Sequence, residues 1–194
     1  MNLRKLCFVV SRSFDFYTWY PVLLLVTIFN TGLSTNQIKI LLPTLLFLEV
    51  LLPILLFLLV LKSGMISDVD VTKRAERPKL FGTMTFIVLV GTIFSFFVAN
   101  KLFFVLQFLA LVICITNFLI TLKWKISGHM IMNASSIFAI NYLFDWKLWW
   151  LFAIVPVVAF ARIYLKKHTL SQLLAGAVVG LAEPILILKL FKLV

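Results

Sequence analysis

The sequence predicts an all-α, polytopic membrane protein, a bundle of six to seven transmembrane helices. Of its 194 residues, 63% are hydrophobic and only 13% are charged, whereas soluble globular domains are about 45–50% apolar. The charged residues lie between apolar runs, and several of these runs approach the about 20 residues that cross a bilayer. The composition therefore excludes an ordinary soluble domain.

The expected elements follow the apolar runs in order. Residues 1–16 are interpreted as an interfacial segment, because the apolar core at 6–10 is too short for a signal peptide and basic residues flank it. Residues 17–194 then form a single membrane-embedded domain. Its candidate spans are 17–33, 38–61, 81–99, 102–122, 130–144, 148–164 and 169–190. The first of these spans is short and is also compatible with a partly interfacial position.

Two local patterns mark the last span. Thr169 and Gln172 match the T-x-x-Q capping box that begins a helix. Gly176 and Gly180 form a G-x-x-x-G, which lets a neighbouring helix approach closely. Both patterns predict a helix that starts at residue 169 and packs against another helix.

The charge balance is basic, with 18 Lys and Arg against 7 Asp and Glu, a net charge of +11. These residues lie in short loops at helix ends, which predicts contact with lipid headgroups rather than with nucleic acid. If every span crosses, the polar loops 62–80, 123–129 and 162–169 share one face with the N-terminus. Because that face has more Lys and Arg, the positive-inside rule makes it cytoplasmic in a plasma or inner membrane. A homodimer is compatible with the sequence.

Three polar loops contain residue types suited to phosphate chemistry. Arg77 and Arg162 can clamp a phosphate through paired N–H donors. The hydroxyl of Ser127 and the backbone near Gly128, at the start of a helix, add neutral donors.

The only two histidines of the chain, His129 and His168, lie in the same loops. Two histidines suit a two-step phosphoryl transfer, in which one attacks phosphorus and the other protonates the leaving oxygen. The arrangement requires neither a metal nor a cofactor.

The order R-P, then S-G-H, then R-x5-H resembles the type-2 phosphatidic acid phosphatase superfamily of membrane lipid phosphatases. The family pattern is K-x6-R-P, P-S-G-H and S-R-x5-H-x3-D, and the resemblance covers residues 68–180. It implies that Arg77, Arg162, Ser127 and Gly128 bind the phosphate. It also implies that His168 is the nucleophile, forming a phosphohistidine, and that His129 is the general acid.

The chain departs from the family pattern at four positions. Asp70 replaces the family Lys, whose charge Lys73 or Arg74 would then have to supply. Ile126 and Ala161 replace a Pro and a Ser. Gln172 replaces the Asp that orients the nucleophile, and its amide oxygen can still accept the imidazole N–H. A Gln in this context is similar to polyprenyl (dolichyl-type) diphosphate phosphatases, which favours an isoprenoid diphosphate over phosphatidic acid or phosphatidylglycerophosphate as substrate.

Three alternatives stay open. The motif residues are also compatible with ordinary turns, helix caps and topogenic charges. The stretch SDVDVTKRAERP faintly resembles the Asp-rich motif of magnesium-dependent intramembrane prenyltransferases, although the chain has no second such motif. A non-catalytic protein of the same fold that binds or transports a lipid phosphate would tolerate Asp70 and Gln172. Separately, Glu49 within an apolar run indicates either a functional site or a polar pair between helices.

Overall fold

The computed structural model describes residues 2–193, and all regular structure in that range is helical. The α-helices are α1 (Leu3–Ser13), α2 (Phe16–Asn30), α3 (Thr35–Leu45), α4 (Leu52–Lys62), α5 (Arg77–Val98), α6 (Lys101–Lys123), α7 (Gly128–Leu143), α8 (Ile154–Tyr164) and α9 (Leu170–Leu190). A π-helical segment, Leu46–Leu51, joins α3 to α4, and short 3-10 turns at Arg74–Glu76 and Trp149–Ala153 precede α5 and α8. The all-α prediction is confirmed.

Helical segments occur at all seven predicted spans, but they differ in length. Four are long and apolar enough to cross a membrane: Thr35–Lys62, Arg74–Val98, Lys101–Lys123 and Leu170–Leu190. The helix α7 has 16 residues, about 24 Å at 1.5 Å per residue, against a hydrocarbon core of about 30 Å. Phe16–Asn30 and Trp149–Tyr164 are also shorter apolar helices. Six or seven crossings stay a prediction.

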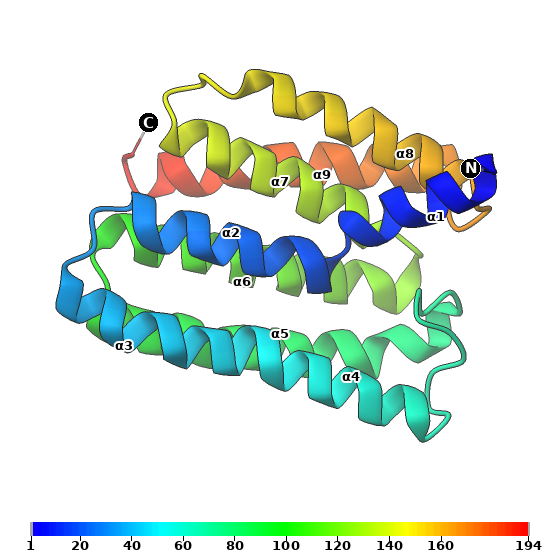
Figure 1. Cartoon of the computed structure of the whole chain (residues 1–194), viewed down its shortest axis with the longest axis horizontal. Coiled ribbons are helices and arrows are strands. Elements are labelled where there is room, and N and C mark those ends of the chain that lie inside the picture. Colours follow the sequence, from blue (N-terminus) through cyan, green and yellow to red (C-terminus); the bar gives the residue numbers. More distant parts are fainter. Residues whose placement is uncertain (1, 194) are drawn as a thin grey trace. The chain divides into compact units, whose positions relative to one another are not determined.

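The chain divides into two compact units. The terminal unit comprises the described residues of Met1–Thr27 and Ile126–Val194, and the central unit comprises Ile28–Lys125. Figure 1 shows α7, α8 and α9 of the terminal unit and the helices α3 to α6 of the central unit.

The terminal unit is built around the close pair α7 and α9 (Figure 1). A Cβ on Gly176 would stand 2.8 Å from the Ser127 carbonyl oxygen, and one on Gly180 would overlap the Ile131 carbonyl oxygen. Gly176 lies against Ser127, and Gly180, one turn later on α9, lies against Ile131, one turn later on α7. The helices α7 and α9 therefore run parallel, and α8 connects them in the chain. The predicted helix packing at the G-x-x-x-G is confirmed, and Met130, Val158 and Leu173 form the core beside it.

The central unit consists of the continuous helix Thr35–Lys62 and the hairpin of α5 and α6. The carboxyl group of Glu49, in the π-helical segment, accepts a hydrogen bond from the side-chain amide of Gln107 on α6. Gly91 on α5 provides the space, because a Cβ there would overlap the Glu49 carboxyl oxygen. Glu49 is thus part of a buried polar contact among three helical segments.

Candidate functional site

The two histidine motifs lie together at one end of the terminal unit, where α7 and α9 begin. The backbone N–H of Ser127 donates to the carbonyl oxygen of Gln172, at 3.3 Å. Gly176 then allows the backbone at Ser127 to lie directly against α9. Since a helix N-terminus bears a partial positive charge, two parallel helices that begin side by side favour an anion at this end.

His168 lies just before α9 and is buried. Its Nδ1 atom is 3.2 Å from Oε1 of Gln172, and the same oxygen accepts the Thr169 backbone N–H at 3.2 Å. The hydroxyl of Thr169 accepts the Gln172 backbone N–H in return, so the predicted capping box is confirmed. Because an amide oxygen is only an acceptor, this contact requires a proton on Nδ1, and in the neutral imidazole the lone pair is then on Nε2.

Arg162 lies in the last turn of α8 and is almost completely buried. The helix ends in a Schellman motif, since Lys166 N–H donates to Ile163 O and Lys167 N–H donates to Arg162 O, at 2.8 and 3.0 Å. Lys166 accordingly has a φ of 55°, in the left-handed region. This tight turn connects Arg162 to the His168 segment. The Arg162 guanidinium donates to the hydroxyl of Ser11 on α1, at 2.8 Å.

Ser127 precedes α7 as its N-cap, with Gly128 as the first helical residue. Its side chain makes no capping hydrogen bond, and its hydroxyl is buried without a hydrogen-bond partner among the described residues. A buried hydroxyl without a partner costs about 1–3 kcal/mol. The start of α7 therefore retains a donor that a bound anion would satisfy.

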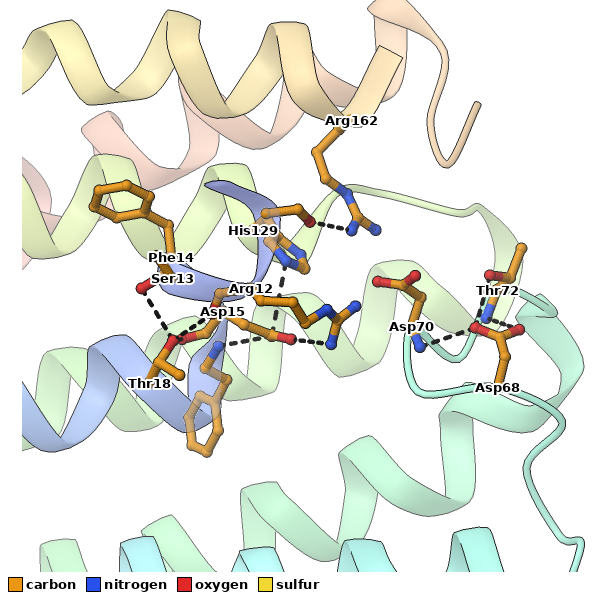
Figure 2. A network of polar contacts seen from close by, with 12 residues as sticks. Arg12, Ser13, Phe14, Asp15, Thr18, Asp68, Asp70, Thr72, His129 and Arg162 are labelled. Carbon is orange, nitrogen blue, oxygen red and sulfur yellow. Dashed lines mark hydrogen bonds and ion pairs between the residues drawn. The ribbon is translucent and has the colours of Figure 1, made fainter. Parts of the chain in front are cut away.

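His129, in the first turn of α7, faces the turn between α1 and α2. Its Nε2 atom lies 3.7 Å from Oδ1 of Asp15. The other carboxyl oxygen of Asp15 accepts a hydrogen bond from Arg12, at 2.6 Å. Figure 2 shows Arg12 and His129 both directed at the Asp15 carboxylate, with Arg162 at the end of α8.

The remaining predicted phosphate ligands belong to the central unit. Arg77, the first residue of α5, is buried and donates from Nε to the carbonyl oxygen of Val71, at 2.8 Å. Arg74 donates to the carbonyl oxygens of Thr121 and Leu122 at the end of α6, and Lys73 pairs with Glu76 at 3.5 Å. Arg74 and Lys73 thus have structural contacts within their own unit. Their predicted phosphate binding, and that of Arg77, stays a prediction.

The loop before Arg77 folds around Asp68. This carboxylate accepts the Asp70 backbone N–H at 2.8 Å and both the backbone N–H and the hydroxyl of Thr72, at 3.2 and 2.9 Å (Figure 2). The pattern is a local turn that side-chain oxygens stabilise. Asp70, one of the four departures from the resembled family pattern, lies within this turn.

Sequence reasoning missed the contribution of residues 11–15. Ser11 contacts Arg162, and Asp15, which accepts from Arg12, faces His129. Asn133 donates to the carbonyl oxygens of Phe14 and His129, at 3.0 and 2.7 Å. One signal was present: Asp15 is one of only seven acidic residues and follows a basic segment.

Neither a group of metal ligands nor a related protein adds to the assignment of these residues. Among residues 2–193, no three or more His, Cys, Asp or Glu side chains are grouped as a metal site would require. Comparison of the chain with protein-family models, with curated proteins and with solved structures finds no match.

Proposed function

We propose that the chain is an integral membrane lipid phosphatase that hydrolyses a lipid phosphate or pyrophosphate through a phosphohistidine. The observation that carries the proposal is the hydrogen bond between Ser127 N–H and Gln172 O, because it joins the S-G-H motif to the R-x5-H-x3-Q motif in one unit. Two histidines and an arginine can supply the nucleophile, the acid and the charge stabilisation of a metal-independent phosphoryl transfer.

The reaction has two steps. Nε2 of His168 attacks phosphorus, while the bond from phosphorus to the lipid oxygen breaks and that oxygen takes a proton from His129. Water then attacks the phosphohistidine and gives a proton back to His129, which releases inorganic phosphate and returns both histidines to their starting forms. Arg162, the Ser127 hydroxyl and the start of α7 near Gly128 stabilise the phosphoryl oxygens.

The neutral partner of His168 supports a nucleophile role. Gln172 orients the imidazole through Nδ1, as an Asp would, and it does so without adding a negative charge. The substitution therefore preserves the tautomer in which Nε2 attacks. An isoprenoid diphosphate is the favoured substrate, by the resemblance of this motif to polyprenyl diphosphate phosphatases.

The proposal includes six or seven crossings in a plasma or inner membrane, with the motif loops on the cytoplasmic face. The two shorter apolar helices and α7 would then cross by thinning the bilayer or by packing within the bundle. Labelling of single cysteines introduced at Asp145, before α8, and at Lys166, after α8, tests this topology. If α8 crosses the membrane, the two cysteines must react with a reagent added to opposite sides.

A phosphate-release assay on the purified chain in detergent tests the function. Phosphatidic acid, phosphatidylglycerophosphate and a polyprenyl diphosphate are each supplied with and without EDTA. We expect release in EDTA, fastest from the diphosphate. Activity that requires magnesium would favour the prenyltransferase alternative, and binding without any release would favour the non-catalytic one.

A further inference from the structure

We propose that Asp15 is a positioning residue that keeps His129 protonated, so that the N-terminal turn determines which histidine is the acid. The inference rests on the proposed function. It assigns a role to residues 11–15, which none of the three sequence motifs includes.

The Asp15 carboxylate is held in place from two sides. Its Oδ2 accepts from Arg12 at 2.6 Å, and its Oδ1 accepts the backbone N–H of Phe16 at 2.7 Å. This Oδ1 is also the atom 3.7 Å from Nε2 of His129. A carboxylate held by two donors is preorganised to face His129.

The turn that contains Asp15 is attached to the helix that contains His129. The side-chain amide of Asn133 donates to Phe14 O on the turn and to His129 O on α7, at 3.0 and 2.7 Å. One amide therefore joins the residue before Asp15 to the histidine itself. Ser11 adds a second attachment, at Arg162.

The charge at this end of the unit requires such a partner. The charged or titratable groups of the neighbouring elements are Arg4, Lys5, Cys7 and Arg12 on α1, Asp15 and Tyr17 at the turn and the start of α2, Arg162 on α8, and Lys166, Lys167 and His168 before α9. Arg12 and Arg162 contact Asp15 and Ser11 of the N-terminal segment, and such permanent cations disfavour a second positive charge on an imidazole nearby. The Asp15 carboxylate at 3.7 Å offsets this repulsion at His129.

The two histidines consequently have different partners. His168 contacts a neutral amide oxygen, at 3.2 Å, whereas His129 faces a carboxylate. A neutral imidazole is a nucleophile, and an imidazolium is an acid. Environments that separate two titratable groups in this way assign the acid and the nucleophile of a reaction.

The dependence of rate on the leaving group tests the inference. The full chain and Asp15→Asn are assayed in detergent with dodecyl phosphate, whose alkoxide must be protonated, and with p-nitrophenyl phosphate, whose leaving group needs no acid. General acid catalysis contributes about 10²–10⁴-fold. We expect Asp15→Asn to lower kcat/KM for dodecyl phosphate by at least about 10-fold, and that for p-nitrophenyl phosphate by less than about 3-fold.

Asp145→Asn is the matched control, since Asp145 is 82% exposed and pairs only loosely with Lys147; both rates should stay at the wild-type level. Equal losses with the two substrates would show that Asp15 is merely structural and would overturn the inference, as would wild-type rates for both. If Asp15→Asn does not fold, Asp15→Glu takes its place, because a retained carboxylate must keep the wild-type ratio of the two rates. A wild-type chain inactive on both substrates would instead contradict the proposed function.

Discussion

The two units of the chain differ in where their buried polar groups lie and in how these groups are paired. In the central unit, Glu49 and Gln107 contact each other in the middle of long apolar helices, where Gly91 leaves room for them. In the terminal unit, the buried site residues Arg162, His168 and Ser127 lie at helix ends, and the Ser127 hydroxyl is buried without a described partner. A polar pair that is satisfied within the protein stabilises packing, whereas donors and charges directed to one end of a unit are suited to a ligand.

The broadest expected effect, on both stability and activity, tests the helix pair that supports the site. Gly180→Ala places a methyl group against the Ile131 carbonyl oxygen, so α7 and α9 must separate. Overpacking of this kind costs about 1–3 kcal/mol. We expect a lower apparent Tm in detergent and a loss of phosphate release of at least about 10-fold, because the S-G-H loop moves away from α9.

Val178→Ala is the control for this substitution, since Val178 lies on the same helix and is exposed. It should change neither measurement appreciably. Full activity in Gly180→Ala would show that close packing of α7 and α9 does not position the site.

The second prediction concerns Ser127, where we expect a substitution to affect activity and stability differently. Ser127→Ala removes a buried hydroxyl without a described partner, so we expect the apparent Tm to stay the same or rise. If the hydroxyl binds phosphate, kcat/KM falls about 10–100-fold, the equivalent of a hydrogen bond of about 1.5–3 kcal/mol to a charged group. Thermal melts and rates on the same samples check both parts, and a lower Tm with unchanged kcat/KM would make Ser127 structural.

The narrowest effect, on stability alone, concerns the polar pair of the central unit. Glu49→Leu leaves the Gln107 amide without the acceptor that Glu49 supplies, and we expect a loss of about 1–3 kcal/mol in stability. The double variant Glu49→Leu, Gln107→Leu should recover part of that loss, because removing both partners of a buried hydrogen bond is nearly neutral. Melting temperatures of Glu49→Leu, Gln107→Leu and the double variant measure the coupling.

Activity per folded molecule distinguishes the two interpretations of Glu49. If the pair only joins helices, all three variants should hydrolyse substrate at rates near the wild type. A selective loss of kcat in a variant with wild-type Tm would assign Glu49 a role in the reaction instead.

What the sequence predicted well depends on local patterns. Apolar runs placed the helical segments from α2 to α9, because crossing a bilayer requires long stretches of apolar residues. They did not place α1, which lies in the predicted interfacial segment. The T-x-x-Q cap and the G-x-x-x-G contact were predicted from three- and four-residue spacings. The π-helical segment at Leu46–Leu51 was not predicted, since it has no sequence signature of comparable strength.

What the sequence could not predict depends on contacts between distant segments. Ser11 and Arg162 are 151 residues apart, and Phe14 and Asn133 are 119 residues apart. The residues 11–15 therefore read as a basic interfacial segment, whereas the structure places Ser11 and Asp15 against two predicted site residues. Only the tertiary fold of the terminal unit brings them there.

The central claim is that His168 carries the phosphoryl group, and phosphate release by His168→Ala tests it most directly. The variant is compared with wild type and with Leu170→Ala, an exposed position in the same segment, using the substrate that wild type hydrolyses fastest. We expect His168→Ala to fall to the uncatalysed background with an unchanged Tm, while Leu170→Ala keeps the wild-type rate. A wild-type rate in His168→Ala would contradict the account.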